Sequence, residues 1–141
     1  MSDRRFLAVA GIVTVGAGSL TGCSVDAMIW GPDGAAVIRA TDAVVEDMTS
    51  GIATDLVCDD ATPELGTAAD WQGLSAGEPE RFRAEYWEDL VPLDPQWNIN
   101  LEGLPDGAVQ GDEFPGDIFY RETDEGLCVV EVVWSTLVWQ G

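Results

Sequence analysis

The side chains that most enzymes use as general bases and nucleophiles are largely missing from this sequence of 141 residues. It contains no histidine and no lysine, which excludes a Ser-His-Asp triad, a Cys-His pair, a Schiff-base lysine and a zinc site with histidine ligands. It also lacks the phosphate-binding loop that ends in lysine and the dinucleotide-binding fingerprint. We therefore expect no enzymatic activity, no catalytic residues and no cofactor. The remaining chemistry must come from carboxylates, cysteines and tryptophans.

Carboxylates are abundant, and the pairs that are adjacent in the sequence include those at positions 59–60, 112–113 and 124–125. A glycosidase holds two carboxyl groups across a cleft, about 5 to 9.5 Å apart. Neighbours on a strand point to opposite faces, and neighbours on a turn are both solvated. The spacing therefore favours solvated turns, and a small hydrolase that works with carboxylates alone is the alternative.

A second acidic feature is the loop 106–117, which contains Asp106, Asp112, Glu113 and Asp117 together with glycines. Hard cations such as calcium take several oxygen ligands from flexible loops. The spacing of an EF-hand is absent, so a solvated acidic loop between two strands is the favoured interpretation. We predict no metal ligands, and weak binding of divalent cations by this loop is left open.

Six tryptophans in so short a chain are the other unusual feature. Aromatic walls with few polar groups are typical of small-molecule sites. The alternative interpretation is that the rings fill a core that is poor in leucine and phenylalanine. The candidate ligand pocket consists of Trp87, Trp97, Trp134 and Trp139.

The N-terminus has the layout of a secretory signal. Arg4 and Arg5 precede an uncharged apolar run, Phe6 to Ala17, which is too short for a membrane-spanning helix of about 20 residues. The run is followed by Leu20-Thr21-Gly22-Cys23, which resembles the lipobox of bacterial lipoproteins. The resemblance implies cleavage before Cys23, a diacylglycerol thioether on Cys23, and often a further fatty acid such as palmitate on the new amino terminus.

That resemblance divides the chain into a signal peptide (1–22), a lipidated tether (23–34) and one acidic domain (35–141). It implies a protein that is anchored by lipid to the cell membrane and faces the extracytoplasmic side, in an inner or an outer membrane. With Cys23 assigned to lipid, Cys58 and Cys128 remain as a pair in an oxidising compartment, and we predict a disulfide between them. Two separate thiols or a metal pair would be the alternatives.

The full chain has 26 acidic residues against 6 basic ones, a formal charge of −20. Loss of the signal removes Asp3, Arg4 and Arg5, which makes the mature chain more negative by one charge. Such a charge repels nucleic acid and other polyanions. We therefore exclude nucleic acid as a partner, and a positively charged surface is the partner class that the charge favours.

The spacing of apolar residues predicts helices in the first part of the chain. Residues 35–50 carry one apolar stripe at three- and four-residue spacing. Residues 52–58 are expected to form a short helix or a turn-rich extension, and 59–77 a loop. Residues 78–90 are predicted to be a second helix, because Pro79 suits a first turn and Phe82, Tyr86 and Leu90 repeat every four residues.

The second part of the chain changes to a two-residue period, which predicts strands at 97–102, 117–123 and 127–140. The last strand is apolar on both faces, so we expect it to be central or covered on both sides. The fold class is therefore α+β, with one or two N-terminal helices packed on a curved antiparallel sheet of three to five strands. This order of elements resembles the cystatin-like, nuclear-transport-factor-like rolls of small exported lipoproteins.

These features favour a membrane-anchored extracytoplasmic lipoprotein that acts as a non-enzymatic binding or interaction module of the cell envelope. Its partner would be an envelope protein or a small ligand. The alternatives are the small carboxylate hydrolase and a structural component of the envelope whose acidic surface spaces or hydrates the wall.

Overall fold

The computed structural model describes residues 21–138, with side chains from Val25 onward. Residues 1–20 of the expected signal peptide, and Trp139 of the candidate pocket, lie outside the described residues. The elements, in chain order, are α1 (Thr21–Thr49), α2 (Ala68–Trp71), β1 (Ser75–Arg81), the 3-10 helix η2 (Glu88–Leu93), β2 (Trp97–Glu102), β3 (Glu113–Thr123) and β4 (Gly126–Thr136).

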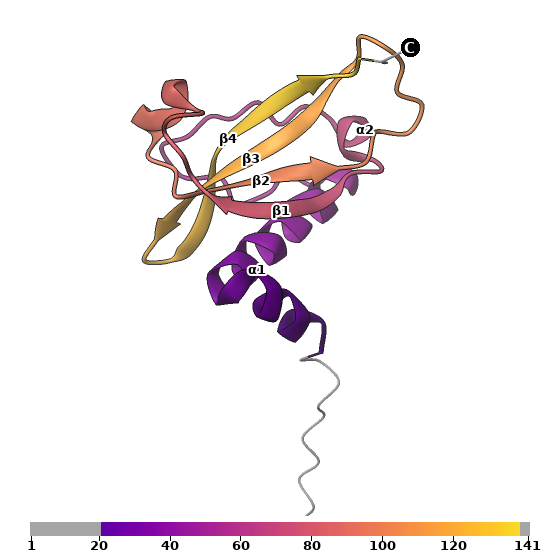
Figure 1. The fold of residues 1–141 in the computed structure, drawn as a ribbon. Coiled ribbons are helices and arrows are strands. Elements are labelled where there is room, and N and C mark those ends of the chain that lie inside the picture. The colour runs from indigo at the N-terminus through magenta and orange to yellow at the C-terminus, as the bar shows by residue number, and fades with distance from the viewer. Residues whose placement is uncertain (1–20, 139–141) are drawn as a thin grey trace, which may run out of the picture.

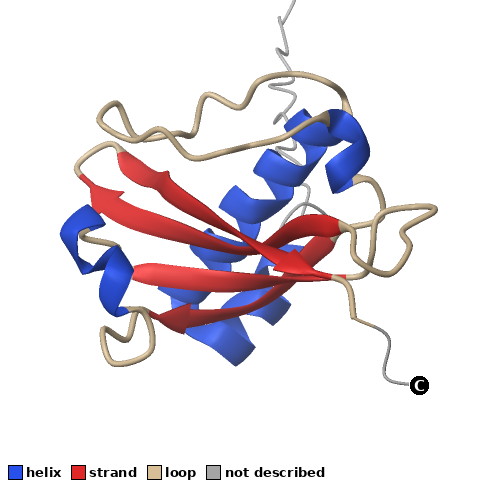
Figure 2. Ribbon diagram, turned by 90° about the horizontal axis from the view of Figure 1, so that it is seen from above, coloured by secondary structure: helices blue, strands red, loops and turns tan. Residues whose placement is uncertain are grey.

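The elements form two layers, a long helix and an antiparallel sheet with the strand order β1-β2-β3-β4. Figure 1 shows α1 under the sheet, and Figure 2, seen from above, shows the strands crossing over it. We call the face of the sheet that is turned away from α1 the outer face. The predicted α+β class, with a helix packed on an antiparallel sheet, is confirmed, and the four strands lie within the predicted three to five.

The main core lies between α1 and the sheet. The helical stripe predicted from spacing is buried there, with Val37 and Val44 both fully buried. The stripe also places Thr41 against the sheet, where its hydroxyl donates to the Val37 carbonyl at 2.8 Å and accepts from the Tyr120 hydroxyl at 2.8 Å. Both hydroxyls are buried, and this chain of hydrogen bonds leaves neither unpaired. The sheet contributes Trp97, Ile99, Ile118, Tyr120, Val129 and Val132 to the same core.

Helix α1 is longer than predicted and is bent. Residues 23–34, expected as a tether, are helical on both sides of Gly31, whose φ of 76° and ψ of 169° interrupt the helix. Glycine adopts this left-handed φ without the steric penalty of a Cβ. Pro32 follows as a first helical residue, where the missing N–H costs nothing. We call residues 21–30 the N-terminal arm and 32–49 the C-terminal arm.

The predicted second helix at 78–90 is wrong. Its first part belongs to β1, an edge strand paired with β2, and only 88–93 are helical, as η2. Pro79 lies on this edge strand, where a residue without an N–H is tolerated. A register shift between Ala76 and Pro79 bends the strand, and the Asn100 side-chain oxygen accepts the Glu78 N–H at 2.8 Å. Tertiary pairing therefore outweighs the four-residue repeat.

The strand predictions hold with changed bounds. β2 agrees with 97–102, β3 begins earlier than expected at Glu113, and β4 ends at Thr136. Residues 52–58 are extended rather than helical near their end: Val57 forms a parallel bridge with Val129, and the Cys58 N–H donates to the Val129 carbonyl at 2.9 Å. This segment lies along β4, which is therefore covered beyond the pairing with β3.

A bulge in β4 changes which side chains share a face. Tyr120 pairs with Val129 and Phe119 with Glu131, so Val130 is the extra residue. Strict alternation would place Val130 with Val132. Instead Val130 packs on the outer face with Cys58 and Phe119, whereas Val132 belongs to the core under α1.

Candidate functional site

The outer face carries a small second core. Phe119 is fully buried there, and Phe82 and Trp87 meet its ring edge-on, with centroids 6.1 and 4.8 Å away. Such edge-to-face pairs add about 0.5–1.5 kcal/mol beyond the area they bury. Together with Leu90 and Leu93, these contacts hold residues 82–93 against the sheet. The segment that failed to form a helix thus becomes a cover for one end of the outer face.

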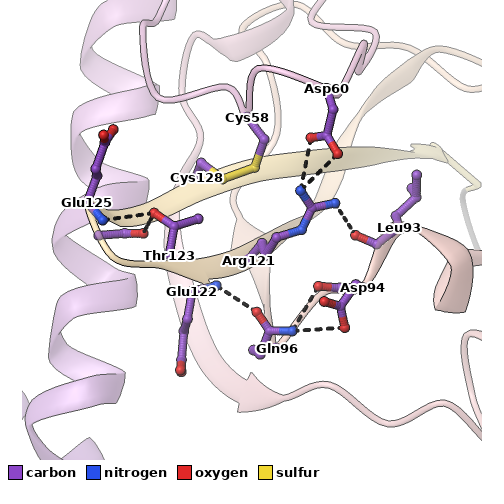
Figure 3. The surroundings of a disulfide bond; sticks show 11 residues. Cys58, Asp60, Leu93, Asp94, Gln96, Arg121, Glu122, Thr123, Glu125 and Cys128 are labelled. Carbon is purple, nitrogen blue, oxygen red and sulfur yellow. Dashed lines mark hydrogen bonds and ion pairs between the residues drawn. A yellow bond between two sulfur atoms is a disulfide. The ribbon is translucent and has the colours of Figure 1, made fainter.

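Cys58 and Cys128 form a disulfide at the edge of this second core (Figure 3), as the sequence predicts. The bond joins two residues separated by 70 positions, with Cα atoms 4.9 Å apart. It ties the chain that leaves α1 to the beginning of β4.

A groove of about 530 Å³ surrounds the disulfide, and we call it the disulfide groove. Its walls come from the chain after α1 and from the β3–β4 hairpin. Two of the adjacent carboxylate pairs, 59–60 and 124–125, line this one groove. The carboxylates of the groove are Asp55, Asp59, Asp60, Asp124 and Glu125. The folded chain thus concentrates negative charge in one groove, whose lining also includes the apolar residues Leu56, Val57 and Leu127.

Arg121 is the basic residue of the disulfide groove, and its guanidinium is already engaged (Figure 3). One terminal nitrogen donates to the two carboxylate oxygens of Asp60 at 2.9 and 3.2 Å, and the other donates to the Leu93 carbonyl at 2.5 Å. Its buried Nε has no hydrogen-bond partner within the described residues. Arg121 therefore joins the groove wall to the 82–93 segment and neutralises only part of the acidic lining.

The sequence contained a signal for this groove that residue-by-residue interpretation missed. Asp59 and Asp60 directly follow Cys58, and Asp124 and Glu125 stand shortly before Cys128. Once the two cysteines are paired, the acidic residues next to each of them must come together. The participation of Arg121 and Asp55, by contrast, depends on the sheet register and on the path of the chain after α1.

Of the predicted tryptophan pocket, the three residues that the structure describes do not share one site. Trp87 packs on the outer face, whereas Trp97 and Trp134 pack with the core under α1, because residues 97 and 134 face the helix side of their strands. Trp97 donates its ring N–H to the Glu122 carboxylate at 2.6 Å. The Arg81 guanidinium lies over the Trp97 ring, 4.0 Å from its centroid. Trp134 donates to the Glu64 carbonyl at 2.9 Å. The described tryptophans other than Trp30 therefore pack in or against the two cores.

Two further hollows adjoin these rings. One of about 590 Å³ lies beside Trp87 and is lined by residues 85–90 and Val133, and one of about 230 Å³ lies beside Trp97 and Glu122. Neither contains more than one tryptophan.

The acidic loop 106–117 is shaped by its own hydrogen bonds. The Asp112 side chain accepts the Val109 N–H at 2.8 Å, and Asp117 lies beyond the loop on β3, paired with Asn100 and Val133. Over residues 21–138, no three acidic or cysteine side chains stand close enough to hold a metal ion.

Asp117 is the carboxylate whose environment differs most from water. Its alternation with the buried Ile118 places it on the outer face, and burial, with the charge of Glu80 as a second cause, raises its pKa from 3.8 to about 6. Because the folded-state pKa is raised, the fold takes up a proton between about pH 4 and pH 6, and this group favours unfolding at neutral pH.

Replacing Asp117 with Asn should therefore raise the free energy of unfolding at pH 7. It should also remove part of the increase in stability that the wild-type protein shows as the pH falls from 6 to 4. A shift of this size would correspond to about 3 kcal/mol, and partial exposure of the group reduces the expected gain to about 1 kcal/mol. Urea unfolding at several pH values measures it. Glu102→Gln, an exposed carboxylate on β2, is the charge-matched control. A less stable Asp117→Asn variant at pH 7 would contradict the assignment.

Cys23, the predicted lipidation site, lies in the N-terminal arm, and its side chain is outside the described part of the structure. No helix within residues 21–138 has both the length and the apolar character needed to cross a bilayer.

Comparison of the chain with protein-family models, with curated proteins and with solved structures gives no significant match.

Proposed function

We propose that this protein is a membrane-anchored extracytoplasmic lipoprotein of the cell envelope that acts as a non-enzymatic binding module, and that the disulfide groove takes a positively charged segment of its partner. The observation that carries the proposal is the groove itself. Five carboxylates line it, and the single arginine beside them is bonded to Asp60 and Leu93. The anchor is supported by the resemblance of residues 20–23 to a lipobox.

The chemistry of the groove selects arginine-rich or lysine-rich partners. An exposed ion pair contributes only about 0–1 kcal/mol, so several are needed, and four of the five lining carboxylates are not paired with Arg121. The apolar part of the lining, Leu56, Val57 and Leu127, suits the methylene stems of arginine and lysine, which pack on apolar surface while the charged ends stay in water. Binding by such a groove is fast, moderate in strength and weakened by salt.

The test compares two variants that lose the same charge. The groove variant carries Asp59→Asn, Asp124→Asn and Glu125→Gln, which leave the Asp60–Arg121 pair intact. The control variant carries Glu85→Gln, Glu88→Gln and Asp89→Asn, which line the hollow beside Trp87. Titration of a short polyarginine peptide, followed by fluorescence anisotropy, gives each dissociation constant.

At about 50 mM salt we expect the groove variant to bind the peptide about 10-fold more weakly, from three pairs of about 0.5 kcal/mol each. The control variant should change by less than about 3-fold, and the difference should shrink above 150 mM salt. Equal weakening by both variants would show that only the net charge acts and would contradict a groove-specific site.

The anchor has its own test. Cells that make the full chain and are fed labelled palmitate should yield a labelled, membrane-bound protein, and Cys23→Ser should abolish both the label and the membrane association. A wild-type chain that takes up no label would contradict the anchor and leave the groove untouched.

A small hydrolase is the second candidate, and Asp117 is the observation that favours it. A carboxyl group with a pKa of about 6 next to a second carboxylate, here Glu80, is the kind of pair from which glycosidases draw a general acid. A hydrolytic activity on any oligosaccharide that disappears in Asp117→Asn would support it. An activity that persists in that variant would remove Asp117 from consideration.

A further inference from the structure

The N-terminal arm of α1 exposes an apolar stripe that no other described part of the chain covers. Val25, Met28 and Ile29 are spaced by three and four residues, so they lie on one face of the helix. Their exposed fractions are 55%, 85% and 63%. Trp30, at 37% exposure, falls on the opposite face by the same spacing. Exposed apolar side chains grouped in this way indicate an interaction site.

The opposite face of the same arm is turned toward the rest of the molecule. Asp26 and Ala27 are half-buried, and Asp26 lies close enough to the C-terminal arm for its charge to contribute, after burial, to a raised pKa of Asp42. The bend at Gly31 produces this arrangement, because it turns the N-terminal arm away from the line of the C-terminal arm (Figure 1). The apolar stripe therefore points away from the sheet and its core.

The position of the stripe in the chain limits what can cover it. Val25 follows Cys23 by two residues, and the arm rises by about 1.5 Å per residue, so the whole stripe lies within about 10 Å of the anchored residue. The headgroup layer on each side of a bilayer is about 5–8 Å thick. A chain anchored at Cys23 thus holds the stripe at the depth where headgroups meet acyl chains.

The charge of the arm agrees with this location. Although the full chain carries a formal charge of −20, Asp26 is the only charged residue among positions 21–30, and it lies off the stripe. The repulsion between the acidic surface and anionic lipids therefore acts on the sheet and its loops, and the arm itself can approach the bilayer.

We infer that the N-terminal arm lies in the plane of the membrane interface, with Val25, Met28 and Ile29 immersed among the lipid chains, and that it holds the rest of the molecule in one orientation. This inference rests on the lipid anchor of the proposed function. In this arrangement the anchor is a short amphipathic helix together with its lipid, a form of attachment in which buried apolar area adds to that of the acyl chains.

The cysteine content of the chain permits a site-specific test. Of its three cysteines, Cys58 and Cys128 are bonded to each other and Cys23 is the lipid site, so a cysteine introduced at Met28 is the single free thiol. The full chain with Met28→Cys, produced in a lipidating bacterial host, is labelled with an environment-sensitive fluorophore. It is then reconstituted in phosphatidylcholine vesicles with and without brominated acyl chains. Ser50→Cys, at the far end of α1 and exposed, is the matched control.

The expected result is blue-shifted emission at position 28 and quenching of at least about half by the brominated lipid, with neither effect at position 50. Adding Val25→Ser and Ile29→Ser should return the position-28 probe most of the way to its emission in water. Circular dichroism of each variant verifies that the fold is intact.

Two results would overturn the inference alone. In lipidated protein, a position-28 probe with water-like emission would show that the arm does not dock, and a shielded probe without quenching would show that a second copy or another protein covers the stripe. Incorporation of two fluorophores per chain would instead show that Cys23 is free, which overturns the anchor and the docking together.

Discussion

Loss of the Cys58–Cys128 disulfide should lower the free energy of unfolding by about 4 kcal/mol. The bond closes a loop that spans 70 positions, and cross-linking a loop of this length removes that much conformational freedom from the unfolded chain in the chain-entropy model. Few other interactions hold the segment around Cys58 against β4 in the folded state. Two backbone hydrogen bonds, from Cys58 N–H to the Val129 carbonyl and from Val129 N–H to the Leu56 carbonyl, attach the segment to β4.

Thermal and urea unfolding of the full chain, with and without reductant, measure this effect. The midpoint should fall by about 15 °C on reduction, and the double replacement Cys58→Ser with Cys128→Ser should reproduce it. Reductant added to the double variant is the control and should change nothing further. The disulfide groove should also bind the polyarginine peptide more weakly in the reduced protein, because one wall loses its attachment. An unchanged midpoint would contradict the assigned role of the bond.

Replacing Phe119 with Ala should cost about 3–5 kcal/mol, the range for removing a buried aromatic ring. Phe119 is fully buried at the centre of the outer-face core, and Phe82 and Trp87 both pack on its ring. Its removal leaves a cavity beneath residues 82–93 and releases the segment whose Leu93 carbonyl fixes Arg121. We therefore expect reduced stability together with a mobile 82–93 segment.

Urea unfolding gives the loss of stability, and hydrogen exchange of residues 82–93 reports the local opening. Val91→Ala serves as the control, because Val91 belongs to the same segment and is 47% exposed. It should cost less than about 0.5 kcal/mol. A Phe119→Ala protein with wild-type stability would mean that the outer-face core is not packed as described.

Much of the fold could be predicted because the relevant signals are local. The stripe of Val37, Thr41 and Val44 repeats with the helical period, and Trp97 to Glu102 alternates strictly, so α1 and β2 follow from spacing alone. The disulfide followed from a count of cysteines. These features need no knowledge of distant contacts.

The features that could not be predicted depend on contacts between distant segments. Residues 78–90 have a helical repeat, yet pairing with β2 makes 78–81 a strand and contact with Phe119 holds Phe82 and Trp87 against the sheet. The bulge at Val130 exists only as a mismatch between β3 and β4. The local sequence of residues 78–90 and of β4 does not indicate either feature.

The candidate site shows the same division. The acidic pairs beside Cys58 and Cys128 could have been combined as soon as the cysteines were paired. The tryptophans could not be assigned to a pocket or to a core, because the sequence does not show whether a ring lies on the helix side or on the outer face of the sheet. The pKa of Asp117 is raised first by burial and second by the charge of Glu80 on β1, and both causes depend on how the strands pair.

The two edges of the sheet decide how the protein behaves when many copies crowd together. An open edge strand offers unpaired N–H and C=O groups to a neighbouring molecule and promotes aggregation. On β1, Pro79 removes one donor, the register shift after Ala76 bends the strand, and Glu78, Glu80 and Arg81 add charge. On β4, Val57 and its neighbours occupy part of the edge. β1 is thus protected by its sequence and shape, and β4 over part of its edge, which disfavours the joining of strands from adjacent molecules into larger sheets.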